Sequence, residues 1–414
     1  AGRSACRPAR ARSLASTRSP IPNGTHIPGG TMRHWAWGIA VLFSLASACS
    51  SQERSAAPTS PIDSTSAALT AQLTVPDGFK VAYFARNLPG VRFMALGADG
   101  AVYASESAAG KVVRIWDVDG DGVADSVATV VDGLNRPHGL AFHGGYLYIA
   151  NTNAVVRVRL GSDGRAVSAP EELTHLDGGG GHWSRTIVFG ADSMMYVSIG
   201  STCNLCVETS PERAAVMRYD ADGQNGQRFA WGLRNAVGMA VDPATHVLWV
   251  SQNERDNLTP DHQNLPPEEI NVLHEGGDYG WPYCYTLHAA AVPNPEYHDA
   301  GRCATTVPAA LEMQAHSAPL GITFLAAATQ FPEAYRGDLL VAFHGSWDRD
   351  VPTGAKVVRV HVANGAPVSA EDFVTGWQRP DGSRWGRPVD VMVYRDGSVL
   401  VSDDQSGAIY RVSH

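Results

Sequence analysis

The chain has 414 residues, of which 44% are hydrophobic, enough for a large core. Its 42 glycines and 25 prolines favour many short strands joined by turns over long helices. Residues 1–48 carry six arginines and no acid, so the remainder has 26 basic and 41 acidic residues, a net charge of −15. This acidic balance, with only three lysines, argues against nucleic-acid binding.

The first 48 residues are predicted to lie outside the folded domain. Residues 1–31 are rich in Arg and Ser and lack acids, and we interpret them as upstream translation before Met32. The apolar run that follows, residues 35–45, is too short to span a bilayer and resembles the core of a signal peptide.

The stretch "LASAC", ending at Cys49, resembles a bacterial lipobox, although Leu45 stands one position further from the cysteine than usual. We therefore expect a bacterial exported protein, periplasmic or anchored to a membrane only through a lipid, with plain secretion as the alternative. Residues 49–72 are rich in Ser, Ala and Pro, a composition typical of a disordered tether.

From residue 73 onward, a pattern of apolar strand, turn and second apolar strand occurs six times. The second strands are marked by Tyr103, Tyr148, Tyr196, Trp249, Leu340 and Leu400, at intervals of 45, 48, 53, 91 and 60 residues. Strand pairs repeated about every 40–50 residues predict a β-propeller. We expect an all-β, six-bladed propeller over residues 73–414, with an insertion at about residues 255–318; a two-sheet sandwich is the alternative.

In the first repeat, "DVDGDGVAD" places Asp117, Asp119, Asp121 and Asp125 at positions one, three, five and nine of a calcium loop. The glutamate of position twelve is missing, because Ala128 stands there. The spacing predicts a structural Ca²⁺ site, with a solvated acidic turn as the alternative.

Arginines precede the first strand in five of the six repeats: Arg92, Arg136, Arg185, Arg234 and Arg387. In a propeller these positions meet at one end of the central channel, and guanidinium groups there suit a planar anion. For Arg92 and Arg136, bonds between blades are an equally good interpretation. A run of four glycines leads to His182 and Arg185, which we predict as the catalytic pair beside a flat ligand, because glycine permits close backbone approach.

Four cysteines fall within the predicted propeller. Cys203 and Cys206 form a C-x-x-C, and Cys284 and Cys303 lie within the insertion. In an exported chain two disulfides, each joining one of these pairs, are expected. A zinc site is the alternative, but no second cysteine or histidine pair has the usual spacing.

The stretch "SQNERD" places Asn253, Glu254, Arg255 and Asp256 at the end of a predicted strand, where carbonyl and carboxylate oxygens suit a hard cation such as Ca²⁺. Together with "GHWSR", "GLRN", "DYGWP", "FHGSWDR" and "GRPVDV", the sequence resembles the glucose/sorbosone dehydrogenase family, closest to its sorbosone-dehydrogenase-like branch. These are six-bladed quinoproteins that use pyrroloquinoline quinone (PQQ), and the resemblance spans residues 73–413.

The resemblance implies oxidation of a sugar or sugar-derived aldehyde, with electrons passed to an external cytochrome or quinone. It implies that His182 is the general base and that Ca²⁺ bound near Glu254 and Arg255 activates PQQ. For the cofactor contacts it implies Arg234, Asn235, Arg387 and the "FHGSWDR" residues His344, Trp347 and Arg349.

The sequence departs from the soluble glucose dehydrogenases at three places. The "FHGSWDR" motif lacks a cofactor-binding lysine, for which Arg349 is the predicted substitute. Ser201 stands near the position of an aspartate associated with the catalytic histidine, and Glu254 stands where the sorbosone-like branch tends to have glycine. Two other functions therefore remain open: a propeller lactonase and a cell-surface carbohydrate-binding propeller without redox activity.

Overall fold

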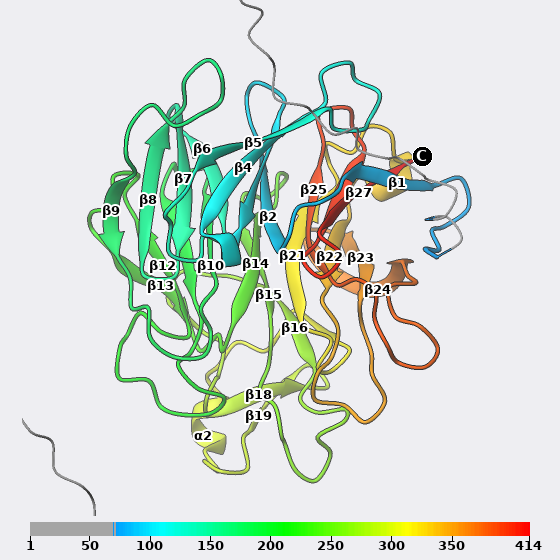
Figure 1. Cartoon of the computed structure of the whole chain (residues 1–414). Coiled ribbons are helices and arrows are strands. Elements are labelled where there is room, and N and C mark those ends of the chain that lie inside the picture. Colours follow the sequence, from blue (N-terminus) through cyan, green and yellow to red (C-terminus); the bar gives the residue numbers. More distant parts are fainter. Residues whose placement is uncertain (1–68, 70–71) are drawn as a thin grey trace, which may run out of the picture. The chain divides into compact units, whose positions relative to one another are not determined.

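Six antiparallel sheets, each wound as one blade, surround a common axis in the computed structural model (Figure 1). The structure describes residue 69 and residues 72–414. The predicted signal peptide, Cys49 and most of the predicted tether lie outside the described residues. No helix within the described range is long and apolar enough to cross a membrane.

The strands of each blade follow from the innermost outward. Blade 1 consists of β2 (Val91–Leu96), β3 (Val102–Glu106), β4 (Lys111–Trp116) and β5 (Ser126–Val131). Blade 2 consists of β6 (Leu140–His143), β7 (Tyr146–Asn151), β8 (Ala154–Arg159) and β9 (Glu171–His175). Blade 3 consists of β10 (Arg185–Phe189), β11 (Met195–Ile199), β12 (Ala215–Tyr219) and β13 (Gln227–Trp231), with β17 (Gly277–Asp278) added in parallel.

Blade 4 consists of β14 (Ala236–Val241), β15 (Leu248–Gln252), β16 (Glu268–Val272) and β20 (Leu311–Met313). Blade 5 consists of β21 (Pro319–Phe324), β22 (Leu339–Phe343), β23 (Lys356–Ala363) and β24 (Ala366–Val374). Blade 6 consists of β25 (Pro388–Val393), β26 (Val399–Asp403), β27 (Ala408–Ser413) and β1 (Lys80–Ala85). Outside the blades lie the hairpin β18 (Cys284–Leu287) and β19 (Ala290–Pro293), the helix α2 (Ala300–Cys303) and the short 3-10 turns η1 (Ser107–Ala109) and η2 (Glu333–Tyr335).

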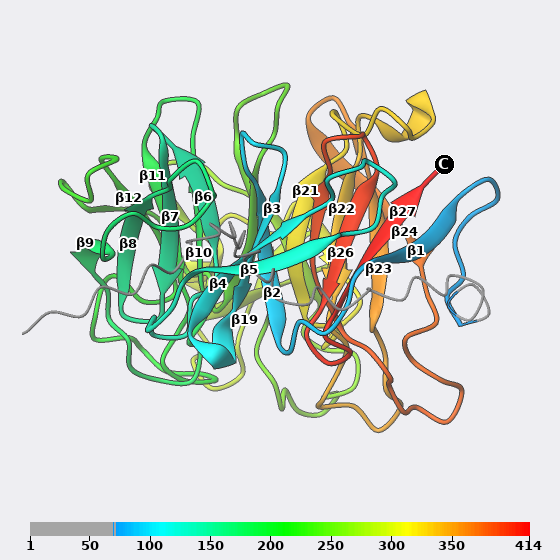
Figure 2. The ribbon, with the colours of Figure 1, turned by 45° about the horizontal axis from the view of Figure 1, so that its top comes forward.

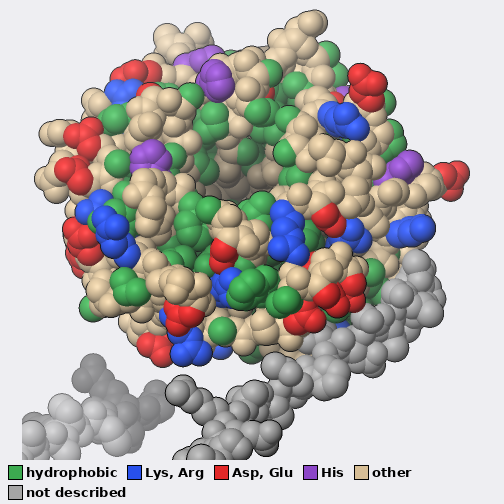
Figure 3. Space-filling view, turned by 90° about the horizontal axis from the view of Figure 1, so that it is seen from above, with side chains coloured by type: hydrophobic (Ala, Val, Ile, Leu, Met, Phe, Trp, Pro, Cys, Tyr) green, Lys and Arg blue, Asp and Glu red, His purple; other side chains and the backbone are tan. Residues whose placement is uncertain are grey.

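The ring is closed by its first and last strands. Strand β1 pairs antiparallel with β27, from Lys80 opposite Ser413 onward, and the two lie side by side in both ribbon views (Figures 1 and 2). Leu69, within the predicted tether, is buried in the core between blades 5 and 6. Ordered packing therefore begins before residue 73. One face of the ring has a hollow at its centre (Figure 3).

The predicted six-bladed propeller is confirmed. Each of the six landmark residues lies in the second strand of its blade and is buried in a core between that blade and the next. Nearly every residue of these second strands is buried, because both faces of the strand pack against neighbouring blades, and this explains the continuous apolar runs in the sequence.

The predicted insertion at residues 255–318 was too wide. Two segments within it, Glu268–Val272 and Leu311–Met313, are the third and fourth strands of blade 4, and the β18–β19 hairpin and α2 lie between them. Both predicted disulfides, Cys203–Cys206 and Cys284–Cys303, are confirmed. The second disulfide joins the hairpin to α2, within the insertion.

Candidate functional site

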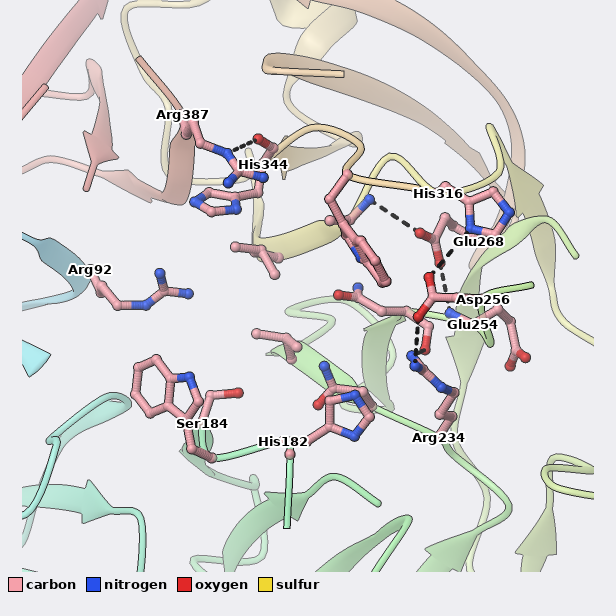
Figure 4. A pocket seen from close by; sticks show the side chains of 18 residues that line it. Arg92, His182, Ser184, Arg234, Glu254, Asp256, Glu268, His316, His344 and Arg387 are labelled. Carbon is pink, nitrogen blue, oxygen red and sulfur yellow. Dashed lines mark hydrogen bonds and ion pairs between the residues drawn. The ribbon is translucent and has the colours of Figure 1, made fainter. Parts of the chain in front are cut away.

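A cavity of about 410 Å³ lies where the innermost strands begin, at one end of the channel. Its floor is apolar, because Val237 and Leu320 belong to a ring of inner-strand side chains completed by Phe93 and Val389. Its walls are polar. In Figure 4, Arg92, His344 and Arg387 occupy one side, and Arg234, Asp256, Glu254, Glu268 and His316 occupy the other, with His182 between them.

His182 presents one ring nitrogen as a base. Its Nδ1 lies 2.9 Å from both the carbonyl oxygen and the hydroxyl oxygen of Ser201. That hydroxyl donates its own proton to the Cys203 carbonyl at 2.6 Å, so both Ser201 oxygens act as acceptors toward Nδ1. Nδ1 therefore carries the proton, which leaves Nε2 unprotonated. Burial, and then the charge of Arg234, lower the pKa of His182 to about 4, so the ring is neutral near pH 7.

The glycines around His182 allow two loops to meet. Gly180 has φ +81°, and a Cβ there would lie 2.4 Å from the Thr202 Cα. A Cβ on Gly200 would lie 2.7 Å from the His182 Cβ and 2.5 Å from the Asn235 Oδ1. The Gly-rich run therefore lets the His182 loop pack against the loop that holds Ser201. The close backbone approach that was predicted is present, but the partner is another loop of the protein and not a ligand.

Arg185, predicted as half of the catalytic pair, does not reach the cavity. It is fully buried, and its guanidinium donates to the carbonyls of Asp177, His182 and Ser184 at 2.6–2.8 Å. The cause is that three carbonyl oxygens of the preceding loop lie within hydrogen-bond distance of the guanidinium and turn it away from the cavity. Arg185 therefore holds the His182 loop in shape and is a positioning residue.

Of the five arginines that precede the first strand of a blade, three line the cavity: Arg92, Arg234 and Arg387. Arg387 donates to the His344 and Gly345 carbonyls, each at 2.8 Å, which leaves further N–H groups of its fork available. Arg92 pairs with Asp404, and its Nε is buried without an acceptor. These guanidiniums have unused donors beside the cavity.

Arg234 is held by the C-x-x-C loop and by the end of β15. Its side chain donates to the Asn204 carbonyl and side-chain oxygens, to the Asn253 carbonyl and to Asp256, all at 2.9–3.1 Å. Asn204 lies between the cysteines of the Cys203–Cys206 disulfide. This small disulfide loop thus supports Arg234 through Asn204 and His182 through the Cys203 carbonyl.

Two other predicted residues lie outside the cavity lining. Arg349 donates to the carbonyls of Gln263, Ala315 and Val351, so it ties loops together and does not take the place of the missing lysine. Arg255 turns into the insertion, where it pairs with Glu296 at 2.6 Å. Each guanidinium is drawn to acceptors that come from remote parts of the chain.

Arg136, which also precedes the first strand of a blade, is likewise absent from the cavity lining and stacks on the Trp183 ring at 3.9 Å. Asn235, His344 and Trp347 do line the cavity, as the sequence predicted. His344 bonds Asp404 at 2.9 Å, yet burial lowers its pKa to about 4, so it is neutral near pH 7. The Trp347 side chain is exposed at the rim.

The acidic side of the cavity contains residues that sequence reasoning missed. Glu268 accepts from the backbone N–H groups of Glu254 and Ala318, at 2.7 and 3.1 Å, and burial raises its pKa to about 8. His316 lies against Asp256; burial opposes its protonation, but Asp256 and Glu268 together keep its pKa above the ordinary value.

The carbonyl oxygens of Glu254 and Arg255 accept none of the hydrogen bonds formed among the described residues, and Glu254, but not Arg255, lines the cavity. They are thus free to bind a cation. Nearby, Asp256, His316 and Asp348 bring ligand atoms within 4.8 Å of one another. Asp256 already pairs with Arg234 at 3.1 Å and lies 3.7 Å from His316 Nδ1, so it has less free negative charge to offer a cation.

The Asp117 loop lies between β4 and β5, away from the cavity. Ligand atoms of Asp117, Asp119 and Asp125 lie within 4.8 Å of one another, and Asp121 is outside this group. The Asp117 carboxylate accepts the backbone N–H groups of Gly120 and Gly122. Three of the four predicted ligands are thus brought together, in a turn that its own backbone also stabilises.

The chain matches the TrAA12-like family model over residues 73–414. It belongs to this family. It is 26% identical to a PQQ-dependent sugar dehydrogenase of Hypocrea jecorina, over 82% of this chain and 90% of the relative. It is also 26% identical to a PQQ-dependent pyranose dehydrogenase of Coprinopsis cinerea, over 82% of this chain but only 54% of that protein.

Solved structures support the fold. The Trichoderma reesei carbohydrate-active enzyme of family AA12 superposes with a TM-score of 0.74 at 24% identity, covering 83% of this chain and 97% of that structure. The holo PQQ domain of the Coprinopsis cinerea pyranose dehydrogenase gives a TM-score of 0.72 at 23% identity, with the same coverage. The family resemblance drawn from the motifs is therefore confirmed.

Proposed function

We propose that this protein is a PQQ-dependent dehydrogenase that oxidises a sugar or a sugar-derived aldehyde of the sorbosone or aldose type. One observation carries the proposal: three guanidinium groups and an unprotonated histidine nitrogen face one cavity in a strongly acidic protein. The cofactors named for the relatives, PQQ and calcium, fit this donor set.

The fit to PQQ rests on charge and on unused donors. PQQ is a planar tricarboxylate, and Arg92, Arg234 and Arg387 lie around the cavity with N–H groups to spare. Asn235 and Trp347 would contact the same molecule. A calcium ion would be bound by the free carbonyl oxygens of Glu254 and Arg255, which are hard ligands of the kind Ca²⁺ prefers.

When bound, PQQ would supply the two-electron acceptor, and a calcium ion beside it would make it more electrophilic. The protein's own part centres on His182. Its Nε2 accepts the proton of the substrate hydroxyl, while Ser201 keeps Nδ1 protonated and the ring oriented. Arg185 fixes the loop on which His182 stands, and the arginine-lined cavity fixes the cofactor's carboxylates.

The remaining expectations belong to the same proposal. An external cytochrome or quinone would accept the electrons, and the chain would act outside the bacterial cytoplasm, in the periplasm or on a lipid anchor. A cavity with three arginines suits an anionic cofactor better than the carboxylate-bound metal of a lactonase. The carbohydrate-binding alternative predicts sugar binding without PQQ.

Two arginine variants test the proposal. Arg387 and Arg349 both donate to backbone carbonyls, but only Arg387 lines the cavity. Arg387→Met should weaken PQQ binding about 10- to 100-fold in calorimetric titration, the usual effect of losing a charge-assisted contact. Arg349→Met is the matched control and should bind PQQ normally. Equal effects of the two variants would contradict this placement of the cofactor.

His182→Ala separates chemistry from binding. Turnover should fall about 10²- to 10⁴-fold, the usual contribution of a positioned general base, with PQQ affinity almost unchanged. His175, exposed on β9, is the control and should tolerate alanine without loss of turnover. Full turnover of His182→Ala at saturating PQQ would remove His182 from the mechanism.

A further inference from the structure

A second buried arginine contacts the loop that carries His182. Arg213 lies in the connection between β11 and β12, which also contains the Cys203–Cys206 disulfide, and its side chain is fully buried. It does not line the cavity. The next residue, Ala214, has φ +52°, a left-handed conformation that is costly outside glycine and is concentrated near functional sites. Because a buried guanidinium needs acceptors, the groups that hold Arg213 indicate its role.

The Arg213 guanidinium joins the two loops that meet at His182. Its Nη2 donates to the Asp177 carboxylate at 2.9 Å and to the Gly179 carbonyl, in the segment that leads to the histidine. Its Nη1 donates to the Gly200 carbonyl at 3.1 Å, directly before the serine that accepts the histidine Nδ1 proton. One side chain thus bridges the loop that carries the base and the loop that orients its ring.

The Asp177–Arg213 pair also fixes the glycine run. Gly179 uses both of its backbone groups there: its N–H donates to the Asp177 carboxylate at 3.0 Å, and its carbonyl accepts from Arg213. Arg185 binds carbonyls at the two ends of the segment, those of Asp177 and His182. Glycine loses more conformational freedom on folding than any other residue, so the middle of the run depends on such contacts to keep one conformation.

The two side chains form an ionised pair. The hydrogen bond from Arg213 lowers the pKa of Asp177 to about 2, although burial opposes this. Charge-assisted bonds of this kind are roughly twice as strong as neutral ones. Removing the Asp177 carboxylate would leave the buried guanidinium without its counter-ion, which strongly disfavours its present position. The geometry of the His182 loop therefore depends on an ion pair that lies outside the cavity lining.

We propose that Arg213, paired with Asp177, is a positioning residue for His182, because it holds the glycine run in the conformation that presents the bare Nε2 to the cavity. The inference rests on the function proposed above, in which this nitrogen accepts the substrate proton. Ser201 orients the imidazole ring, and Arg213 holds the backbone on which the ring stands. Arg213 does not line the cavity, and its hydrogen bonds go to the two loops, so it acts only through them.

Arg213→Met tests the positioning role. In PQQ-free protein, NMR titration should show the pKa of His182 rising from about 4 toward about 6.5, because a loosened loop admits water to the ring. With PQQ bound, kcat should fall about 10- to 100-fold, the usual effect of losing a charge-assisted contact, while PQQ affinity stays unchanged. Arg359→Met is the matched control: this buried arginine pairs with Asp338 and binds the Ala334 carbonyl in blade 5, each at 2.6 Å. The control should lower the melting temperature without changing kcat or the pKa of His182.

A His182 pKa that stays near 4 in Arg213→Met, or an equal fall in kcat in the two arginine variants, would overturn the proposal. If Arg213→Met does not fold, Asp177→Ala removes the partner from a partly exposed position. It should shift the pKa of His182 and kcat in the same directions, and parental values of both would overturn the proposal. The NMR comparison needs neither PQQ nor turnover. A parent protein without turnover would therefore contradict the proposed function alone, and the pKa of His182 would still decide whether Arg213 positions the ring.

Discussion

Replacing Ser201 by alanine tests how the histidine is oriented. The serine hydroxyl is one of two acceptors for His182 Nδ1, and the Ser201 carbonyl, at the same 2.9 Å, remains in the variant. One neutral hydrogen bond contributes about 0.5–1.5 kcal/mol. If that contribution is felt in the transition state, kcat falls about 2- to 12-fold, since about 1.4 kcal/mol corresponds to a factor of ten.

The assay is steady-state dye reduction at saturating PQQ and calcium, with PQQ affinity measured separately. Ser201→Ala should lower kcat and leave the PQQ affinity unchanged, because Ser201 does not line the cavity. Ser105, equally buried and bonded to the carbonyls of Phe93 and His138, is the matched control. Its alanine variant should lose stability without losing kcat.

Two results would refute this reasoning. A fall in kcat beyond about a hundredfold would mean that the carbonyl does not hold the ring, so the serine hydroxyl would be the principal partner. An equal fall in Ser201→Ala and Ser105→Ala would mean that the loss reflects general loosening of the propeller.

Three further outcomes are expected. In PQQ-free protein, NMR titration should place the pKa of His182 near 4, and a pKa near 6.5 would contradict its burial. The free energy of unfolding should fall as the pH drops below about 6.5, because the unfolded chain then binds the proton more readily than the folded chain. Replacing Cys203 and Cys206 with serine should lower both kcat and PQQ affinity about 2- to 12-fold, through lost support of the histidine and Arg234; an effect on stability alone would argue against that link. Asp119→Asn should reduce calcium-dependent stabilisation without changing PQQ affinity, and melting identical to the parent with and without Ca²⁺ would leave the loop a plain turn.

The sequence predicted the propeller because the second strand of every blade has to fill the space between neighbouring blades with apolar side chains. Residues such as Tyr148 and Trp249 fill the spaces between blades, so the same apolar sequence pattern recurs in each blade. The third and fourth strands of blade 4 were missed for the opposite reason. Strand β16 begins with two glutamates, at Glu268 and Glu269, and their burial depends on partners that local patterning does not reveal.

The candidate site was predictable in position more than in side-chain direction. The arginines that recur before the first strands correctly located the mouth of the channel, and Arg234 and Arg387 reach it. Arg185 and Arg349 turn away, because carbonyls of the preceding loop accept from Arg185 and a carbonyl of a distant loop accepts from Arg349. His316 would have been found by examining the same position in the fifth repeat, where no arginine stands before the first strand, β21.

The most direct test of the central claim is turnover of the purified protein as PQQ is added in calcium-containing buffer, measured by dye reduction with a panel of aldoses and sugar-derived aldehydes. We predict no turnover without PQQ, a rise that saturates at one PQQ per chain, and oxidation of at least one substrate of the panel. Failure to bind PQQ, or binding without turnover on any substrate, would contradict the assignment. Sugar binding in the absence of PQQ would then favour the carbohydrate-binding alternative.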